Sequence, residues 1–155
     1  MCLSPFDIEQ EAIAEAKTLR LKSDALRLDR DVLVARANVG LGNFDQVLGE
    51  IKENAATPAA LRAVRILAAY LHPELPKAKA LATLETLVAD SSALANPTVQ
   101  YVAAILKMHE GSLNEALRLV KDATTLEQCV ATVCGVPYLR PRCRSPRCSL
   151  SAGWR

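Results

Sequence analysis

The chain has 155 residues, of which 50% are hydrophobic and 23% are charged, so it can bury one domain's core and is too apolar for a disordered chain. Aromatic residues make up only 4%, so the core must consist mainly of Ala, Leu and Val, which favours close-packed helices over a sheet. No run approaches the ~18 apolar residues of a membrane-spanning helix, and residues 1–7 lack the basic and apolar segments of a secretory signal. We therefore expect an all-helical cytoplasmic protein.

The net charge of +2 is unevenly distributed along the chain. Residues 136–155 contain five arginines and no acidic residue, whereas residues 1–135 contain 14 basic and 17 acidic residues, a net charge of −3. Four of the five cysteines fall near the same end: Cys129, Cys134, Cys143 and Cys148. This change of composition predicts a folded domain over residues 1–134 and a disordered Arg/Pro/Cys-rich tail over residues 135–155.

Helical spacing of apolar residues continues from about residue 7 to residue 134. It predicts a first helix over residues 8–22 and a second that starts at Asp29–Asp31, because acidic residues suit a first turn, and ends at Leu41 before Gly42. Further helices are expected over 44–52, 58–71, 77–89, 97 to about 111, and 113–121, with a loop over 91–96. No run alternates apolar and polar residues well enough to predict a strand.

A repeat appears when successive pairs of helices are aligned. Small residues lie 34 and 35 residues apart, and each is followed after seven positions by a turn residue and after nine and twelve positions by apolar residues. The aligned sets are Ala35, Ala69, Ala104; Gly42, Pro76, Gly111; Phe44, Ala78, Leu113; and Val47, Leu81, Ala116. A period near 34 made of two helices is typical of a tetratricopeptide-like solenoid, which we predict as the fold. The small residues would let the helices of a hairpin approach, and the apolar pairs would fill the groove between hairpins.

Candidate catalytic residues are few. His72 and His109 are 37 residues apart, each at the end of a first helix, and we interpret both as C-terminal caps, where a cation suits the helix dipole. Glutamates that cluster at 9–15 and 50–53 are interpreted as solvated helix faces. The sequence has no phosphate-binding glycine loop and no serine nucleophile elbow. We predict no enzymatic activity and no cofactor.

The cysteines near the C-terminus allow an alternative. The spacing Cys-x4-Cys-x8-Cys-x4-Cys is symmetric and could hold Zn²⁺, but x4 is loose for zinc modules and no histidine accompanies it. The five arginines of the tail could bind nucleic acid or anionic lipid without specificity. We favour an unstructured, metal-free tail. The alternative is a protein that binds metal or nucleic acid through this tail. Only under this alternative would deletion of residues 136–155 abolish binding.

Several stretches together resemble a known family. They are Asp29-Arg30-Asp31-Val32, Asn43-Phe44, Val47-Leu48, Glu50-Ile51, Ala55-Ala56-Thr57-Pro58, Ala63-Val64-Arg65, Tyr70-Leu71, Asp90-Ser91, Thr98-Val99, Met108-His109-Glu110 and Asn114-Glu115. Over roughly residues 6–133 the chain is similar to the coatomer epsilon subunit of plants and green algae. The resemblance implies a non-enzymatic, tetratricopeptide-like subunit of the COPI coat, which carries cargo from Golgi to endoplasmic reticulum and within the Golgi. It also implies a grip on the C-terminal domain of the coatomer alpha subunit, association with other coatomer subunits, and a peripheral position on the cytoplasmic side of Golgi membranes and vesicles.

The chain also departs from this family. Family members are about twice as long, the first helix of the first repeat is missing, and the similarity stops near Val133, so we interpret the chain as a truncated epsilon subunit with an unrelated tail. We expect marginal stability, self-association, and partly exposed apolar side chains at Leu117, Val120, Val130 and Val133.

The repeat register also suggests partner-binding residues. Tyr70, Tyr101 and Met108 fall at concave positions where large adaptable side chains suit a partner, and Arg36 could pair with a partner carboxylate. The alternative, that both tyrosines pack within the solenoid, stays open at this point. A generic tetratricopeptide adaptor or co-chaperone would instead need Lys and Asn residues that clamp a carboxylate, and Asn38 alone fits that pattern. No nucleic acid and no small-molecule substrate is expected.

Overall fold

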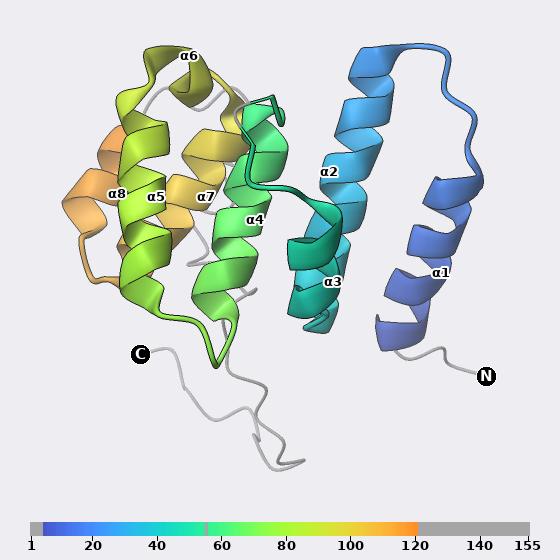
Figure 1. Cartoon of the computed structure of the whole chain (residues 1–155), viewed down its shortest axis with the longest axis horizontal. Coiled ribbons are helices and arrows are strands. Elements are labelled where there is room, and N and C mark those ends of the chain that lie inside the picture. The colour runs from blue at the N-terminus through green and yellow to red at the C-terminus, as the bar shows by residue number, and fades with distance from the viewer. Residues whose placement is uncertain (1–4, 55, 121–155) are drawn as a thin grey trace, which may run out of the picture.

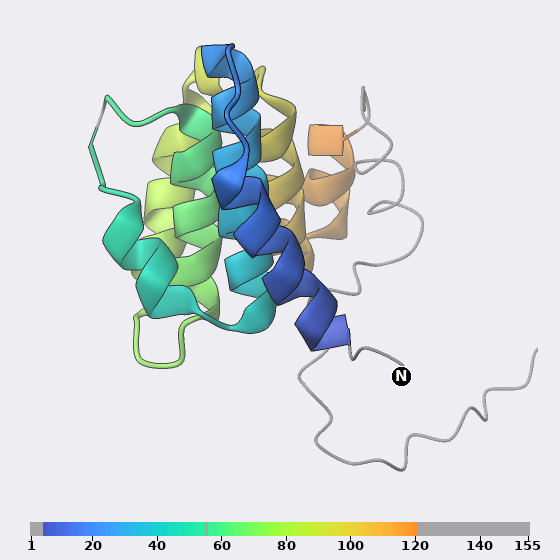
Figure 2. The same cartoon turned by 90° about the vertical axis from the view of Figure 1, so that its right-hand side faces the viewer.

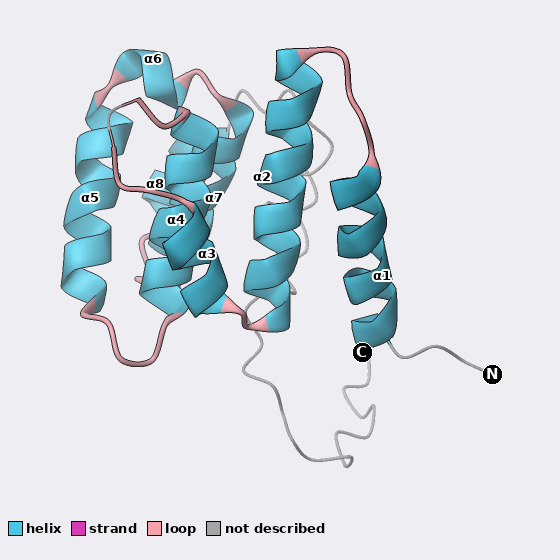
Figure 3. Cartoon of the chain, turned by 45° about the vertical axis from the view of Figure 1, so that its right-hand side comes forward, coloured by secondary structure: helices cyan, strands magenta, loops and turns pink. Residues whose placement is uncertain are grey.

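The chain folds into helices throughout the part that the structure describes. The structure, a computed structural model, describes residues 5–54 and 56–120, with side chains described from residue 10 onward. The helices in these ranges are α1 (Pro5–Thr18), α2 (Asp24–Leu41), α3 (Phe44–Glu50), α4 (Ala59–Leu71), α5 (Lys77–Ala89), α6 (Ser91–Leu94), α7 (Pro97–His109) and α8 (Leu113–Val120) (Figure 1). No strand occurs in the described ranges (Figure 3). The predicted all-helical fold is confirmed.

The helices are arranged as a row of antiparallel hairpins. Three hairpins are formed by α2 with α3, α4 with α5, and α7 with α8, and the first helices pack side by side in the order α2, α4, α7 (Figures 1 and 2). α1 packs against α2 as α3 packs against α4, so α1 occupies the place of a second helix before the first hairpin. This arrangement is the solenoid stacking that the 34-residue period predicts.

Two of the predicted turn residues end the first helix of a hairpin in the same way. Gly42 and Gly111 have φ values of 82° and 79°, in the left-handed region where a side chain would be strained. The amide of Asn43 donates to the carbonyl of Asn38, and the amide of Ser112 donates to the carbonyl of Lys107, at 2.9 Å each. These backbone bonds satisfy helix-terminal carbonyls and reverse the chain within a few residues.

The core lies between the stacked hairpins. Val47 of α3, Leu84 of α5 and six consecutive residues of α7, Tyr101 to Leu106, are buried. The sequence predicted that two apolar positions of each repeat fill the groove between hairpins. The prediction is confirmed for the position of Val47, Leu81 and Ala116, since Val47 and Ala116 are buried and Leu81 is half-buried. The prediction was wrong for the position of Phe44, Ala78 and Leu113. Ala78 and Leu113 are exposed, because both stand at the solvent side of a first helical turn. Phe44 is half-buried, and its ring lies 6.1 Å from the ring of His72.

Helix boundaries differ from the expectation at several places. α1 spans Pro5–Thr18 where residues 8–22 were predicted, and α3 ends at Glu50 instead of residue 52. α2 begins at Asp24, five residues before the predicted Asp29, because the acidic residues 29–31 stand on exposed or half-exposed positions inside the helix and do not start it. Residues Ser91–Leu94 form the short helix α6 where a loop was expected. The carboxylate of Asp90 explains it, since Oδ1 accepts from the Ser92 amide at 3.0 Å and from its hydroxyl at 2.9 Å, which caps the turn.

Exposure near the end of the described part agrees only in part with the expectation. Leu117 is 51% exposed, as predicted, but Val120 is buried, because it packs against Ala104 and Ala116 in the α7–α8 hairpin. Val130, Val133, the four C-terminal cysteines and the predicted tail lie outside the described residues, so the domain boundary at residue 134 stays a prediction. None of the helices between residues 5 and 120 combines the length and apolarity that a bilayer crossing requires.

Candidate partner-binding surface

The predicted partner-binding residues all lie on the layer of first helices, α2, α4 and α7. Arg36 of α2 places its guanidinium carbon 4.9 Å from the centre of the Tyr101 ring on α7, a cation–π contact between the two helices that flank α4. Met108 lies two turns further along α7 and packs partly against the core. The structure therefore brings Arg36 and Tyr101 together, as neighbours on one layer.

Tyr70 stands at the C-terminal end of α4, where three segments meet. Its hydroxyl donates to Oε1 of Glu110 at 2.6 Å, and its ring lies 5.9 Å from the ring of His109 at the end of α7. The Nζ atom of Lys77, the first residue of α5, is 5.2 Å from the centre of the same ring. Tyr70 thus ties together the ends of α4 and α7 and the start of α5.

This environment changes the proton affinity of Tyr70 and His109. Burial, together with the hydrogen bond and negative charge of Glu110, raises the pKa of Tyr70 to about 12. Partial burial and the charge of Lys77 lower the pKa of His109, against a smaller opposing effect of Glu110. His109 lies in the last turn of α7, as the sequence predicted, and its lowered pKa weakens the expected cationic interaction with the helix dipole.

His72 also lies at a helix end, but it acts through hydrogen bonds. Its Nδ1 accepts from the amide of Glu74 at 3.1 Å, so the proton of the neutral ring is on Nε2, which faces Oδ1 of Asp45 at 3.1 Å. The ring therefore connects the end of α4 to the first turn of α3. This is a structural role at the end of α4, as the sequence predicted.

Burial divides the four candidate residues into two pairs. Tyr70 and Tyr101 are 4% and 8% exposed, whereas Arg36 and Met108 are half-buried. The tyrosines consequently support the surface from within, and the outer part of the surface is formed by Arg36 and Met108. That any of the four contacts a partner stays a prediction. Sequence reasoning missed Glu110 and Lys77, and the one available signal was their position beside predicted turn residues.

Asn38, the residue that fitted the carboxylate clamp of a co-chaperone, is not available to a partner. Its side chain is 2% exposed, and Nδ2 donates to the carbonyl of Val34 at 3.0 Å, one turn earlier in α2. The amide is therefore used inside the helix layer, which removes the last element of a carboxylate clamp of the co-chaperone kind.

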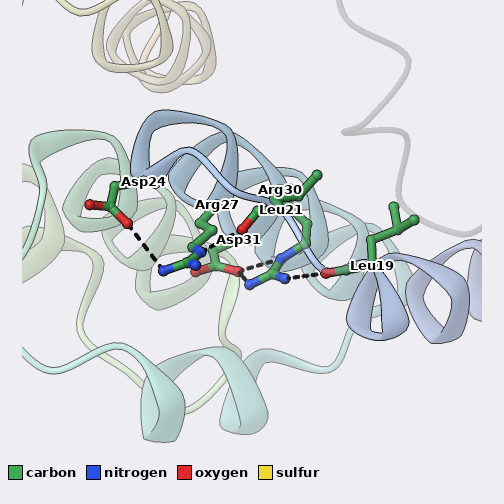
Figure 4. A network of polar contacts seen from close by, with 6 residues as sticks. All are labelled: Leu19, Leu21, Asp24, Arg27, Arg30 and Asp31. Carbon is green, nitrogen blue, oxygen red and sulfur yellow. Dashed lines mark hydrogen bonds and ion pairs between the residues drawn. The ribbon is translucent and has the colours of Figure 1, made fainter.

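A second polar network holds the connection between α1 and α2 (Figure 4). Arg27 donates from Nε to the carbonyl of Leu21 at 2.9 Å, and Arg30 donates from Nη1 to the carbonyl of Leu19 at 3.1 Å. Asp24 and Asp31 orient the two guanidinium groups, with nitrogen–oxygen distances of 3.1 and 2.8 Å. The Arg30-Asp31 pair within one of the resembling stretches therefore has a structural task, since it fixes the loop that leads into the helix stack.

The described residues contain no cluster of three or more side chains that could hold a metal ion. Several of their polar groups cap helices or link one helix to the next. What the arrangement provides is a layer of helices with a partly exposed outer edge, which suits protein binding.

Comparison with known proteins agrees with this architecture. Residues 9–136 match the coatomer epsilon subunit family. The chain belongs to this family. It is 38% identical over 100 residues to coatomer subunit epsilon-2 of Arabidopsis thaliana, a match covering 64% of this chain and 33% of the relative. It is 36% identical over 118 residues to coatomer subunit epsilon-1 of Oryza sativa subsp. japonica and 35% identical over 118 residues to that of Arabidopsis thaliana, in both cases covering 76% of this chain and 39% of the relative.

Membership of the epsilon family sets the class of the protein. Coatomer epsilon subunits are structural components of the COPI vesicle coat and not enzymes. The matches of this epsilon-family chain cover 33–39% of the length of these curated relatives. The search of solved structures gave no significant match.

Proposed function

We propose that this epsilon-family chain is a non-enzymatic structural subunit of the COPI coat that binds the C-terminal domain of the coatomer alpha subunit. In this role it supports Golgi-to-endoplasmic-reticulum and intra-Golgi transport, as a peripheral component on the cytoplasmic side of Golgi membranes and COPI vesicles. The observation that carries the proposal is that the family match over residues 9–136 coincides with an intact stack of three helical hairpins.

The α2–α4–α7 layer is the proposed contact surface. Arg36 supplies a charge that can meet a partner carboxylate, and Met108 supplies an adaptable apolar side chain. The ring of Tyr101 contacts Arg36, and the hydroxyl of Tyr70 donates to Glu110, two residues after Met108. We propose that this chain binds more weakly than a full-length epsilon subunit, because the match covers 39% of the length of epsilon-1 of Oryza sativa subsp. japonica.

A titration of the alpha subunit's C-terminal domain tests the proposal. Isothermal calorimetry would compare this chain with full-length epsilon-1 of Oryza sativa, and we expect saturable but weaker binding by this chain. Arg36→Glu should weaken binding at least tenfold, whereas Lys22→Glu, a charge reversal on the exposed α1–α2 connection, should leave it unchanged. No binding by a folded chain, or equal losses for both variants, would contradict the proposed surface.

A further inference from the structure

A separate groove lies between α3 and α5, with α4 as its floor. It has a volume of about 450 Å³, within the range of pockets that hold ligands or side chains of a partner. Leu48 of α3, Ile66 and Ala69 of α4, and Leu75 and Ala80 beside them give it an apolar lining. Leu75 is 40% exposed, so part of this lining is accessible to solvent.

The groove arises because α3 is shorter than its neighbours. α3 has 7 residues whereas α4 and α5 have 13 each, so the second-helix layer ends early beside α5 and the non-helical stretch after Ile51 takes its place. Arg65 fixes this edge, since its guanidinium group donates to the carbonyls of Leu48 and Ile51 and lies 3.7 Å from Oε2 of Glu53. The wall is therefore held in place before any partner binds, which lowers the entropic cost of binding.

The groove is lined by other helices than those that carry most of the proposed alpha-subunit surface. Arg62, Ile66 and Ala69 follow one another at intervals of four and three residues, which places them on one stripe of α4. Tyr70 follows Ile66 by four residues, about 40° round the helix, and Ala69 by one residue, about 100°, so it lies at the edge of this stripe. The groove lining includes no residue of α2 or α7, which carry Arg36, Tyr101 and Met108, so the two proposed surfaces share only α4.

The rim of the groove is positively charged. Three cations, Arg62, Arg65 and Lys79, surround it against one carboxylate, that of Glu53. Arg65 is paired with Glu53, while the side chain of Lys79 makes no hydrogen bond or ion pair with the described residues 10–54 and 56–120. Arg62 interacts electrostatically with the exposed Asp90 and forms no side-chain hydrogen bond in the same range. Two cationic groups are thus available beside an apolar floor.

We propose that this groove binds an acidic segment of a partner protein, which inserts an aliphatic side chain against Ile66, Ala69 and Leu75 and places carboxylates beside Arg62 and Lys79. Apolar anchoring supplies affinity and charge complementarity supplies orientation and selectivity. This site goes beyond the proposed contact with the alpha subunit, and it gives the chain a second surface for assembly.

Nuclear magnetic resonance of the full ¹⁵N-labelled chain tests this proposal with the peptide acetyl-Glu-Asp-Leu-Leu-Asp-Glu-amide as probe. We expect saturable shifts confined to amides of α3, the first two turns of α5 and the outer stripe of α4. Two control peptides replace either both leucines by serine or all acids by lysine, and both should bind at least tenfold more weakly.

Variants of the chain assign the effect to the groove. The double variant Arg62→Glu with Lys79→Glu should weaken peptide binding at least tenfold, whereas Lys22→Glu should not change it. Ala69→Phe should fill the groove and abolish the shifts. If that variant does not fold, the double charge reversal at Arg62 and Lys79 serves as the decisive test. Absence of saturable binding, shifts centred on Arg36 and Met108, or equal binding of the serine peptide would overturn the proposal. The double variant of Arg62 and Lys79 should leave alpha-subunit binding unchanged. The proposed groove site and the proposed alpha-subunit contact can therefore be tested and rejected separately.

Discussion

Tyr70 is the described side chain whose titration is most clearly altered by the fold. Its pKa is about 12 in the folded chain against 10.0 for an unperturbed tyrosine, so the stabilisation it contributes is complete below pH 10 and is lost as the pH rises from 10 to 12. We predict that subtracting the Tyr70→Phe absorbance titration at 295 nm from that of the unsubstituted chain leaves one tyrosine that ionises well above pH 10. The thermal midpoint of the unsubstituted chain should also fall faster than that of the variant over this range. A difference titration centred on pH 10 would contradict the buried link between Tyr70 and Glu110.

Arg65 is expected to contribute to stability through hydrogen bonds and not through its charge alone. Replacement by Met removes the donors to the carbonyls of Leu48 and Ile51 while it keeps the aliphatic stem. We predict a loss of about 1.5–3 kcal/mol in the free energy of unfolding, because these are bonds from a charged donor to partly buried acceptors. Urea unfolding followed by circular dichroism measures it.

Arg62→Met is the matched control for Arg65→Met. Arg62 lies one turn earlier on α4 and makes no side-chain hydrogen bond within the described ranges, so its replacement should change stability by less than about 0.5 kcal/mol. Equal effects of the two substitutions would show that the edge of the groove is not held by Arg65.

Two glycines in neighbouring elements should respond to alanine in opposite directions. Gly49 lies inside α3, and a Cβ atom there would meet nothing within 4 Å in the described structure, so Gly49→Ala should stabilise the chain by about 0.5–1 kcal/mol. Gly42 has a φ of 82° after α2, and Gly42→Ala should destabilise it by about 1 kcal/mol because of strain in the left-handed region. Differential scanning calorimetry of both variants tests the helix boundaries, and a gain in stability for Gly42→Ala would place the hairpin turn elsewhere.

The whole molecule presents large apolar side chains on its surface. Leu26 and Leu33, seven residues apart on one face of α2, are 53% and 56% exposed, and Leu113 and Leu117 of α8 are 60% and 51% exposed. We predict concentration-dependent self-association, because exposed leucines on one helix face form a hydrophobic patch that a second copy can bury. Sedimentation velocity at increasing protein concentration would measure it. The double variant Leu26→Lys with Leu33→Lys should shift the population toward monomer, while Lys22→Glu should not. A strictly monomeric unsubstituted chain at high concentration would contradict the prediction.

The amino-acid sequence by itself determined the helical class, the period near 34 and the hairpin turns. These features depend on local chemistry: glycine at left-handed positions, proline in a first turn, and apolar residues at helical spacing. Residue identities also carried the family, since the stretches that resemble the coatomer epsilon subunit lie within the matched range 9–136. The start of α5 at Lys77 and its end at Ala89 were predicted to the residue, because Pro76 stands immediately before the helix and the polar residues Asp90 and Ser91 immediately follow it.

The tertiary structure alone decided which side chains of the helix layer are accessible. Helical spacing places Tyr70 and Arg36 at equivalent positions of successive repeats, but burial depends on what the neighbouring helices bring to each position. Tyr70 is buried because Lys77 at the start of the next helix and the distant residues His109 and Glu110 converge on it, whereas Arg36 stays half-exposed over the ring of Tyr101. The groove beside α5 was likewise invisible in the sequence, since it depends on the difference in length between α3 and its neighbours and on the reach of Arg65 across it. Local periodicity determines which residues share a face of a helix, and only long-range packing determines what covers that face.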